Sequence, residues 1–236
     1  MRALQILLVI LQCCACGAVA WRGLASRFPA FLAYLAGSAV RGVALAQYVP
    51  TDRHYLDVWL VTLPVVTLLQ IATAIEAYRH SLEELPGARR YSHWLIIVAS
   101  VLAAALVQIP QKTFSAFGVL SLAQQAVATV LAVAAIGLAT LVTYLRPLRR
   151  PNAVIHERIL ALHFTALAAM LGLVNTGTLG WTSPANVVMS ILCCVAWSLL
   201  LTQEGERMPH RPPGGPPAAE GDLASLRARL TRLLRR

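Results

Sequence analysis

The chain has 236 residues, of which 58% are hydrophobic and only 13% are charged, and its mean hydropathy is +0.65. Because soluble domains carry about 25% charged residues, this composition excludes an ordinary soluble globular protein. The formal net charge of +10 would suit a nucleic-acid binder, but the basic residues lie between long apolar blocks and at the C-terminus. Membrane topology explains that placement without nucleic acid.

Seven apolar blocks follow one another along the chain, each close to the roughly 20 residues that a bilayer-spanning helix needs. Such single segments must be helices, because lipid cannot satisfy exposed backbone groups. We therefore expect an all-α, polytopic seven-transmembrane-helix bundle in residues 1–203. The predicted spans are Ala3–Trp21, Phe28–Val49, Tyr55–Arg79, His93–Ile109, Phe117–Leu145, His156–Leu179 and Pro184–Gln203.

The first block contains the stretch QCCACGAVA, which allows three interpretations. Arg2, the apolar run and the AVA at residues 18–20 fit a signal peptide that is cleaved after Ala20. The closely spaced cysteines fit a thiol site, and the small residues fit an ordinary membrane helix. Cleavage of a signal peptide would change the orientation of all later spans, whereas the other two interpretations would not. The charges of the loops between these spans can therefore test it.

The basic residues favour a retained first helix. With the N-terminus outside, 16 of the 20 lysines and arginines flank the cytoplasmic ends of the spans, and only Arg2, Arg53 and Lys112 flank the outer ends. Cleavage would reverse the six remaining spans and place the larger group outside, against the positive-inside rule. We therefore expect no cleaved signal peptide, an outside N-terminus and a cytoplasmic C-terminus, in a bacterial inner membrane.

Two cysteine groups are predicted to lie at similar depth near the middle of the membrane. Cys13 is about ten residues into the first span and Cys193 about nine residues into the last, which runs in the same direction. If these helices are neighbours, Cys13 or Cys16 can face Cys193 or Cys194, as a disulfide or a soft-metal site requires. Cysteine is also a small apolar packing residue, and we favour this packing role.

Ionisable residues within spans are candidates for function. Arg41 is the deepest, and Asp57 lies just inside the following span, across a short turn. Since the two spans form an antiparallel hairpin, Arg41 can extend toward Asp57. The pair is expected either to lock the hairpin or to contact an anion or substrate.

A second polar group is predicted near the cytoplasmic face. Glu76 and His80 share a face of the third span, and His156 and His163 share a face of the sixth, with His163 alone expected to be deeply buried. Together with His93 and Glu157, these side chains allow a metal site, a haem site or a proton relay. Interface helix ends also commonly carry such residues, and we assign no metal or cofactor to them.

A third polar group lies at the outer turn between the last two spans. It comprises Asn175, Thr176, Thr178, Thr182, Ser183 and Asn186, with Trp181 at the interface. This group either lines an outward-facing pocket or satisfies the backbone groups of two helix ends.

The C-terminal residues differ from the rest of the chain. A proline- and glycine-rich linker is predicted at residues 204–220 and a basic amphipathic helix at 221–236. The leucines of this helix fall on one face and its arginines mostly elsewhere. This pattern favours binding of the helix to an anionic lipid surface over binding to a partner helix. The arginines are Arg227, Arg229, Arg232, Arg235 and Arg236.

The segments SRFPAFLAYLAGSAVRG and YLDVWLVTLPVVTLLQIATAIEAYRH resemble the N-terminal half of an uncharacterised bacterial family of seven-span membrane proteins. In that family a basic-Phe/Tyr-Pro-x-Phe turn follows the first helix and an acid ends the third span. The resemblance covers spans one to three and implies no activity. The matching positions are Arg27, Phe28, Pro29, Phe31, Tyr34, Arg41 and Glu76.

No motif for a catalytic site, a nucleotide or retinal is found. The expected role is therefore a non-enzymatic, receptor-like or scaffold module that binds a ligand, a membrane protein or a second copy of itself within the bilayer. The alternative is a small-solute or proton-coupled transporter, with Arg41 as the substrate contact and Glu76 and His163 as proton carriers. A third interpretation is a haem or metal redox protein.

Overall fold

The computed structural model of the chain describes residues 2–48, 53–82, 116–145, 150–175 and 182–207. Within these residues the fold is entirely helical. The elements are α1 (Arg2–Trp21), α2 (Pro29–Ala46), α3 (Arg53–Ser81), α5 (Ala116–Leu145), α6 (Pro151–Asn175), α7 (Thr182–Leu200) and the 3₁₀-helix η2 (Glu204–Glu206).

The composition of these helices is that of a membrane protein. Five segments are long and apolar enough to cross a membrane, and Pro184–Leu200 is a shorter apolar helix. The five are Arg2–Trp21, Pro29–Ala46, Arg53–Ser81, Val119–Thr140 and Pro151–Val174. The predicted fourth span, His93–Ile109, lies outside the described residues.

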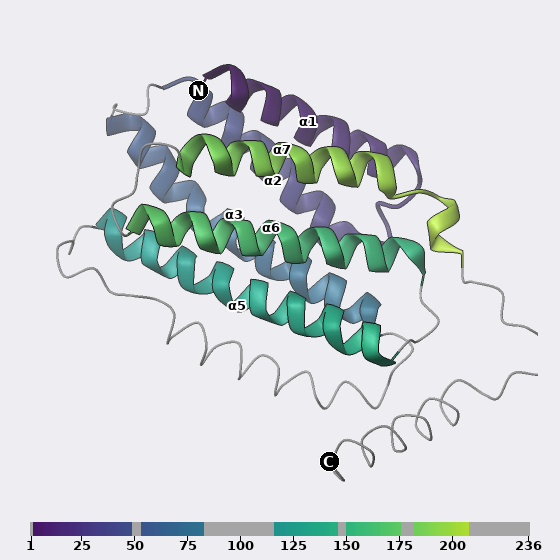
Figure 1. Ribbon diagram of the computed structural model, residues 1–236. Coiled ribbons are helices and arrows are strands. Elements are labelled where there is room, and N and C mark those ends of the chain that lie inside the picture. The colour runs from purple at the N-terminus through teal and green to yellow at the C-terminus, as the bar shows by residue number, and fades with distance from the viewer. Residues whose placement is uncertain (1, 49–52, 83–115, 146–149, 176–181, 208–236) are drawn as a thin grey trace, which may run out of the picture.

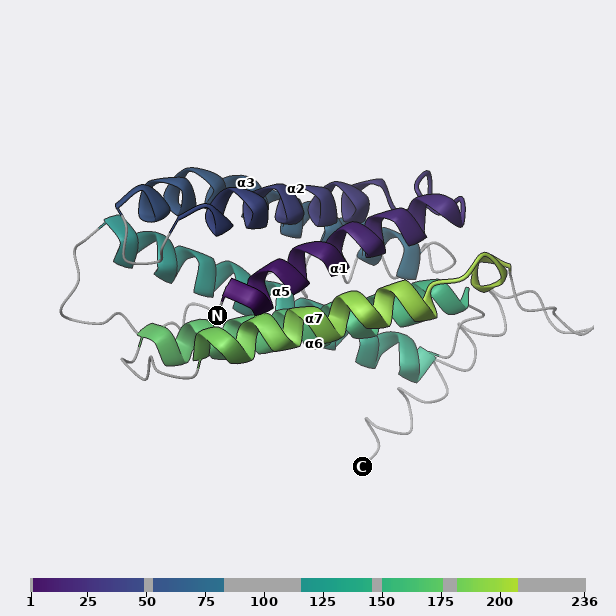
Figure 2. The ribbon, with the colours of Figure 1, turned by 90° about the horizontal axis from the view of Figure 1, so that it is seen from above.

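The six described α-helices form a closed ring (Figures 1 and 2). Each helix packs against the next one in the order α1, α2, α3, α5, α6 and α7, and α7 packs against α1 to close the ring. An additional contact between α3 and α6 crosses the ring. The first and last described helices are therefore neighbours, as the cysteine interpretation required.

Local signals explain where two of the helices meet. α1 ends at a left-handed glycine, Gly23, whose φ is 71°. The amide of Leu24 donates to the carbonyl of Val19 at 3.0 Å, which satisfies a carbonyl at the end of α1. α2 then begins with Pro29, whose fixed φ suits the first helical position. The short link between these signals makes α1 and α2 antiparallel neighbours.

The hydrophobic core lies in the half of the ring near η2. Phe28 and Phe31 from the start of α2 pack with Phe164 of α6 and Trp197 of α7, and each of these side chains is at most 1% exposed. The ring of Phe31 lies 4.7 Å from that of Trp197, centroid to centroid. α1 contributes Ala15 and Val19 to the same cluster. This half of the bundle is therefore closed by aromatic packing.

Several element boundaries differ from the sequence prediction, and two of them lie where α6 begins and α7 ends. α6 begins at Pro151, five residues before the predicted start, and ends at Asn175. α7 ends at Leu200, and the first three residues of the predicted flexible linker form η2. Both differences lie at the η2 end, where polar side chains bind the chain just beyond the apolar blocks. The predicted amphipathic helix at 221–236 and the rest of the linker, from residue 208, lie outside the described residues.

The close approach of α1 to α2 depends on Gly42. A Cβ at this position would lie 2.5 Å from Cγ2 of Val9, whereas a Cβ at Gly17 of α1 would meet nothing within 4 Å. Small residues allow such close helix contacts in membranes. Val9 has little freedom to move away, because a β-branched side chain in a helix has one preferred rotamer.

We expect Gly42→Ala to destabilise the protein relative to Gly17→Ala by about 2 kcal/mol, the usual cost of overpacking a tight interface. Both substitutions make the same gain in helix propensity, so the pair isolates the steric cost. Equilibrium unfolding in mixed micelles would measure it. Equal stability of the two variants would contradict the close contact.

Candidate functional site

A polar pocket lies inside the ring, toward the end where α1 begins and α2 ends. Its cavity volume is about 280 Å³. Each of the six described α-helices contributes a polar side chain to its lining, although all six are predominantly apolar. We call this cavity the bundle pocket. These side chains include Gln12, Ser38, Arg41, Gln70, Gln124, His163 and Asn186.

Arg41 lies at the wall of the bundle pocket on α2. Its guanidinium carbon is 5.6 Å from the ring centroid of Trp59 on α3, a cation–π distance. Its Nε atom is buried and has no hydrogen-bond partner. The charged group is thus held against an aromatic face, with a donor left unsatisfied.

The predicted contact between Arg41 and Asp57 does not form. Asp57 lies one turn inside α3 but is exposed, and no ion pair joins it to Arg41. Successive helical residues point about 100° apart, so Asp57 and Trp59 point to nearly opposite sides of α3. Trp59 faces Arg41, and Asp57 therefore faces away from the hairpin.

The base of the bundle pocket is formed by Tyr34 and His163. The Tyr34 hydroxyl lies 3.0 Å from Nε2 of His163, and both side chains are buried. The amide side chains of Gln70 and Gln124, which are also buried, lie in the same lining. The predicted burial of His163 is confirmed, and its contact with Tyr34 joins α6 to α2.

His163 is not the only deeply buried histidine, contrary to the sequence prediction. His156 is fully buried, with its ring 5.0 Å from that of Phe28 and 4.6 Å from that of Phe31, between centroids. Neither ring nitrogen of His156 has a hydrogen-bond partner. The physical reason is the early start of α6 at Pro151, which places His156 more than one turn inside the helix.

The predicted cytoplasmic histidines make separate contacts. Nε2 of His80 donates to the carbonyl oxygen of Arg27 at 2.7 Å, while His156 is enclosed by aromatic rings and His163 pairs with Tyr34. Glu157 accepts a hydrogen bond from Ser81. In the part of the chain that the structure describes, no three histidine, cysteine or acidic side chains converge as a metal site would require. His93 lies outside this part.

Glu76 binds the start of α2. Its carboxylate oxygens accept hydrogen bonds from the backbone amides of Ala30, at 2.7 Å, and Phe31, at 3.1 Å. The residue that precedes the helix, Phe28, supplies no side-chain cap. Glu76 therefore takes the place of a capping residue from a neighbouring helix and neutralises amides that α2 cannot pair itself.

The cysteines are all free, and their burial differs between the two helices. Cys193 and Cys194 are buried in the core of the bundle, and Cys16 packs against that core. The thiol of Cys16 donates to the carbonyl of Leu32 at 3.7 Å. Cys13 and Cys14 are exposed on the outer side of α1. Of the predicted thiol cluster, Cys16, Cys193 and Cys194 thus share one region and Cys13 points away from it.

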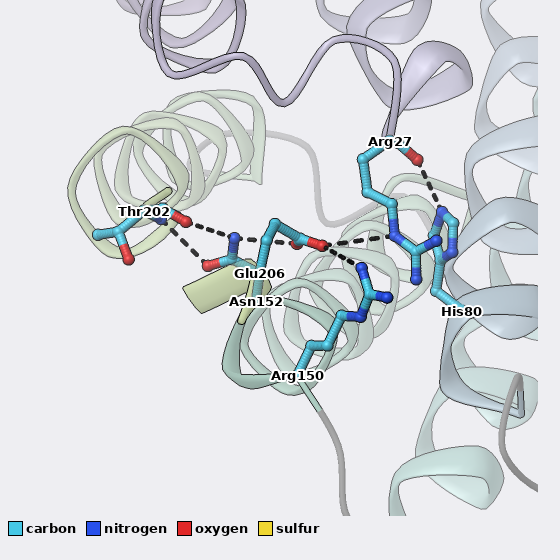
Figure 3. Close-up of polar contacts among 6 residues, drawn as sticks. All are labelled: Arg27, His80, Arg150, Asn152, Thr202 and Glu206. Atoms are coloured by element: carbon cyan, nitrogen blue, oxygen red, sulfur yellow. Dashed lines mark hydrogen bonds and ion pairs between the residues drawn. The ribbon is translucent and has the colours of Figure 1, made fainter. Parts of the chain in front are cut away.

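A second polar cluster joins the end of α7 to α6 and α2 (Figure 3). Asn152, which is fully buried, accepts from the amide of Thr202 at 3.1 Å and donates to the carbonyl of Thr202 at 2.7 Å. It also donates to Glu206 at 3.0 Å. Glu206 forms ion pairs with Arg150 at 3.2 Å and Arg27 at 3.4 Å. We call this cluster the η2 junction.

The predicted polar group at the outer turn is only partly described. Asn175 ends α6, but its side chain lies outside the described residues, as do Thr176, Thr178 and Trp181. Asn186 of the same predicted group lines the bundle pocket. The five arginines of the predicted tail helix also lie outside the described residues.

Comparisons with protein families, with curated proteins and with solved structures found no match to this chain. Its function must therefore be argued from the geometry of the bundle pocket and the η2 junction.

Proposed function

We propose that the chain is a receptor-like module of a bacterial inner membrane that binds a small molecule in the bundle pocket. One observation carries this proposal: six apolar helices each direct a polar side chain into a common cavity of about 280 Å³. Polar groups are costly within a membrane and are usually retained where a ligand or water uses them. The aromatic core beyond Tyr34 and His163 closes the pocket at its base.

The proposed topology has seven spans, with the N-terminus outside and the C-terminus in the cytoplasm. The described helices supply six of them, and the apolar block His93–Ile109 supplies the remaining one between α3 and α5. The packing of α1 against α2 and α7 supports a retained first span. In this orientation the bundle pocket faces outward and the η2 junction faces the cytoplasm, where the basic residues are concentrated.

The C-terminal tail is proposed to act on the cytoplasmic side. Its arginines and leucines suit an anionic lipid surface, and a partner helix is the alternative. Glu206 ties the chain just before the tail to Arg27, beside the start of α2. A change in α2 caused by a ligand at Arg41 can therefore reach the base of the tail through one helix.

A pocket-filling substitution tests the proposed function. Ser38 is half-buried in the lining, so Ser38→Trp is expected to fill the cavity and displace any small molecule that copurifies with the full chain. Ala36→Trp is the matched control, because Ala36 is exposed on the same helix. Native mass spectrometry of both variants in lipid nanodiscs would detect the bound molecule.

The proposal predicts a bound small molecule in the wild type and in Ala36→Trp, but not in Ser38→Trp. A wild type without any bound molecule, or equal occupancy in the two variants, would contradict it. Size-exclusion profiles would confirm that each variant remains a folded bundle.

A transporter is the second candidate function, supported by a cavity near the opposite end of the bundle. This cavity of about 500 Å³ lies between α2 and α3 and is lined by Arg27, Glu76 and His80 among others. Alternating access requires a site that opens toward each face in turn, and cavities near both ends of the bundle are compatible with such opening. Uptake into proteoliposomes that is lost in Arg41→Ala and Glu76→Gln would favour transport over reception.

A further inference from the structure

The charge of Arg41 is not balanced within the bundle pocket. Among the described residues that line it, Arg41 is the only arginine or lysine, and no aspartate or glutamate is present. Asp57, the nearest acid along the chain in α3, is exposed on another side of that helix. An intramembrane guanidinium normally pairs with an acid or another polar partner, and the described lining supplies no acid for Arg41.

The ring of Trp59 compensates for only part of the desolvation of Arg41. A cation–π contact with the ring face offers the guanidinium N–H donors no hydrogen-bond acceptor. The Nε donor is buried without a partner. A carboxylate is the natural partner for such donors, because it accepts two parallel hydrogen bonds from one guanidinium.

The rest of the pocket indicates the size of the partner. Tyr34 and Arg41 are seven residues apart on α2, so the base and the cationic wall are separated by roughly 10 Å along the helix. The cavity of about 280 Å³ lies at the small end of ligand pockets, which span roughly 300–1,000 Å³. That space suits a small organic molecule.

The lining also indicates where each part of that molecule would lie. Val66 and Leu167 supply apolar walls between the cationic and hydrogen-bonding ends. The Tyr34 hydroxyl and the amides of Gln70 and Gln124 offer donors and acceptors at the base. The pocket thus combines one positive charge, an apolar middle and a neutral polar end.

We propose that the bundle pocket binds a small organic monoanion, with its acidic group on Arg41 and a neutral hydrogen-bonding group near Tyr34 and His163. This inference rests on the proposed function and adds the chemical class of the ligand. Because the described lining holds one cation and no acid, it favours a ligand that carries a single negative charge. The anion is supplied either by a free acid or by an anionic lipid headgroup, which share this chemistry.

Calorimetric titration of the full chain in phosphatidylcholine nanodiscs tests the proposal. The probes are benzoate, 4-hydroxybenzoate and 4-hydroxyphenylacetate, each compared with its primary amide, which has nearly the same shape and no charge. We expect at least one acid to bind about tenfold or more tightly than its amide, since charge-assisted hydrogen bonds are the stronger ones.

Variants of Arg41 identify the group responsible. Arg41→Gln is expected to abolish the preference for the acid, and Arg41→Lys to retain part of it, because lysine keeps the charge but not the two-pronged geometry. Arg53→Gln is the matched control: Arg53 is exposed at the same end of the bundle and does not line the pocket. Nanodiscs that contain phosphatidylglycerol test the lipid source, since competition with the acids would identify the headgroup as the anion.

The inference would be overturned by acids and amides that bind equally well, or by a preference for acids that persists in Arg41→Gln. Acids that fail to bind would also overturn it. If the acids fail to bind but Ser38→Trp still displaces a copurifying molecule, the receptor function stands and only the anionic nature of the ligand is refuted. If no copurifying molecule is found either, the receptor function and the anionic ligand are both refuted.

Discussion

Replacing Glu76 with alanine is expected to lower the free energy of unfolding by about 3 kcal/mol, because two hydrogen bonds to a charged acceptor are lost. The amides of Ala30 and Phe31 at the start of α2 would lose their acceptor. Phe28 cannot replace it, since its side chain offers no oxygen. Phe31 belongs to the aromatic core, so the loosened turn would also disturb its packing.

Glu76→Gln should fall between the wild type and Glu76→Ala, because an amide keeps one acceptor oxygen but loses the charge that favours a helix N-terminus. Asp57→Asn is the control: it removes an exposed carboxylate from the same helix and is expected to change stability by less than about 0.5 kcal/mol. Unfolding in mixed micelles, followed by tryptophan fluorescence, would measure all three. A stable Glu76→Ala variant would show that this carboxylate does not hold α2 and would return it to the role of proton carrier.

The helical class and most helix positions could be predicted from the sequence, because both depend on local composition. Apolar length determines which segments form membrane helices. α1 and α5 accordingly agree with the predicted spans within one residue at each described end. The predicted start of α6 was wrong by five residues because the polar Asn152 was placed before the span, whereas the fold buries this side chain in the first turn of the helix.

The bundle pocket could be predicted only in part. Arg41 and His163 stand out as ionisable residues within apolar spans, and both line the cavity. The glutamines Gln12, Gln70 and Gln124 were missed, although uncharged amides deep in apolar segments are a similar signal of internal contacts. Trp59 could not be assigned, because its role depends on which side of α3 faces α2.

The partners of the ionisable residues could not be read from spacing. Arg41 and Asp57 are close across a turn, yet the rotation of α3 separates them. Glu76 and His80 share a helix face, but Glu76 accepts from amides in the first turn of α2, whereas His80 donates to a carbonyl before that helix. Such pairings depend on helix rotation, which is determined by the packing of the whole ring.

The free energy of unfolding is also expected to fall by about 3 kcal/mol when Asn152 is replaced with alanine. This side chain is fully buried and makes three hydrogen bonds, two to the backbone of Thr202 and one to Glu206. Neutral hydrogen bonds contribute about 1 kcal/mol each, and buried groups left unpaired add to the loss. Since Gly205 packs directly on Asn152, η2 would lose both its anchor and its packing surface.

The consequence reaches beyond stability, because Asn152 holds the segment that precedes the tail. In Asn152→Ala the chain from Thr202 onward, where Thr202 and Arg207 are already exposed, should detach from α6 more often. Limited trypsin digestion should then cut at Arg207 at least about tenfold faster, since local opening controls such cleavage. Thr165→Ala, which removes an exposed hydroxyl from the same helix, is the matched control and should leave cleavage unchanged. Equal rates of cleavage in the two variants would contradict a clamp at the η2 junction. Faster cleavage in Asn152→Ala alone would show that the helix ring and the tail are joined at this junction, as transmission from the bundle pocket requires.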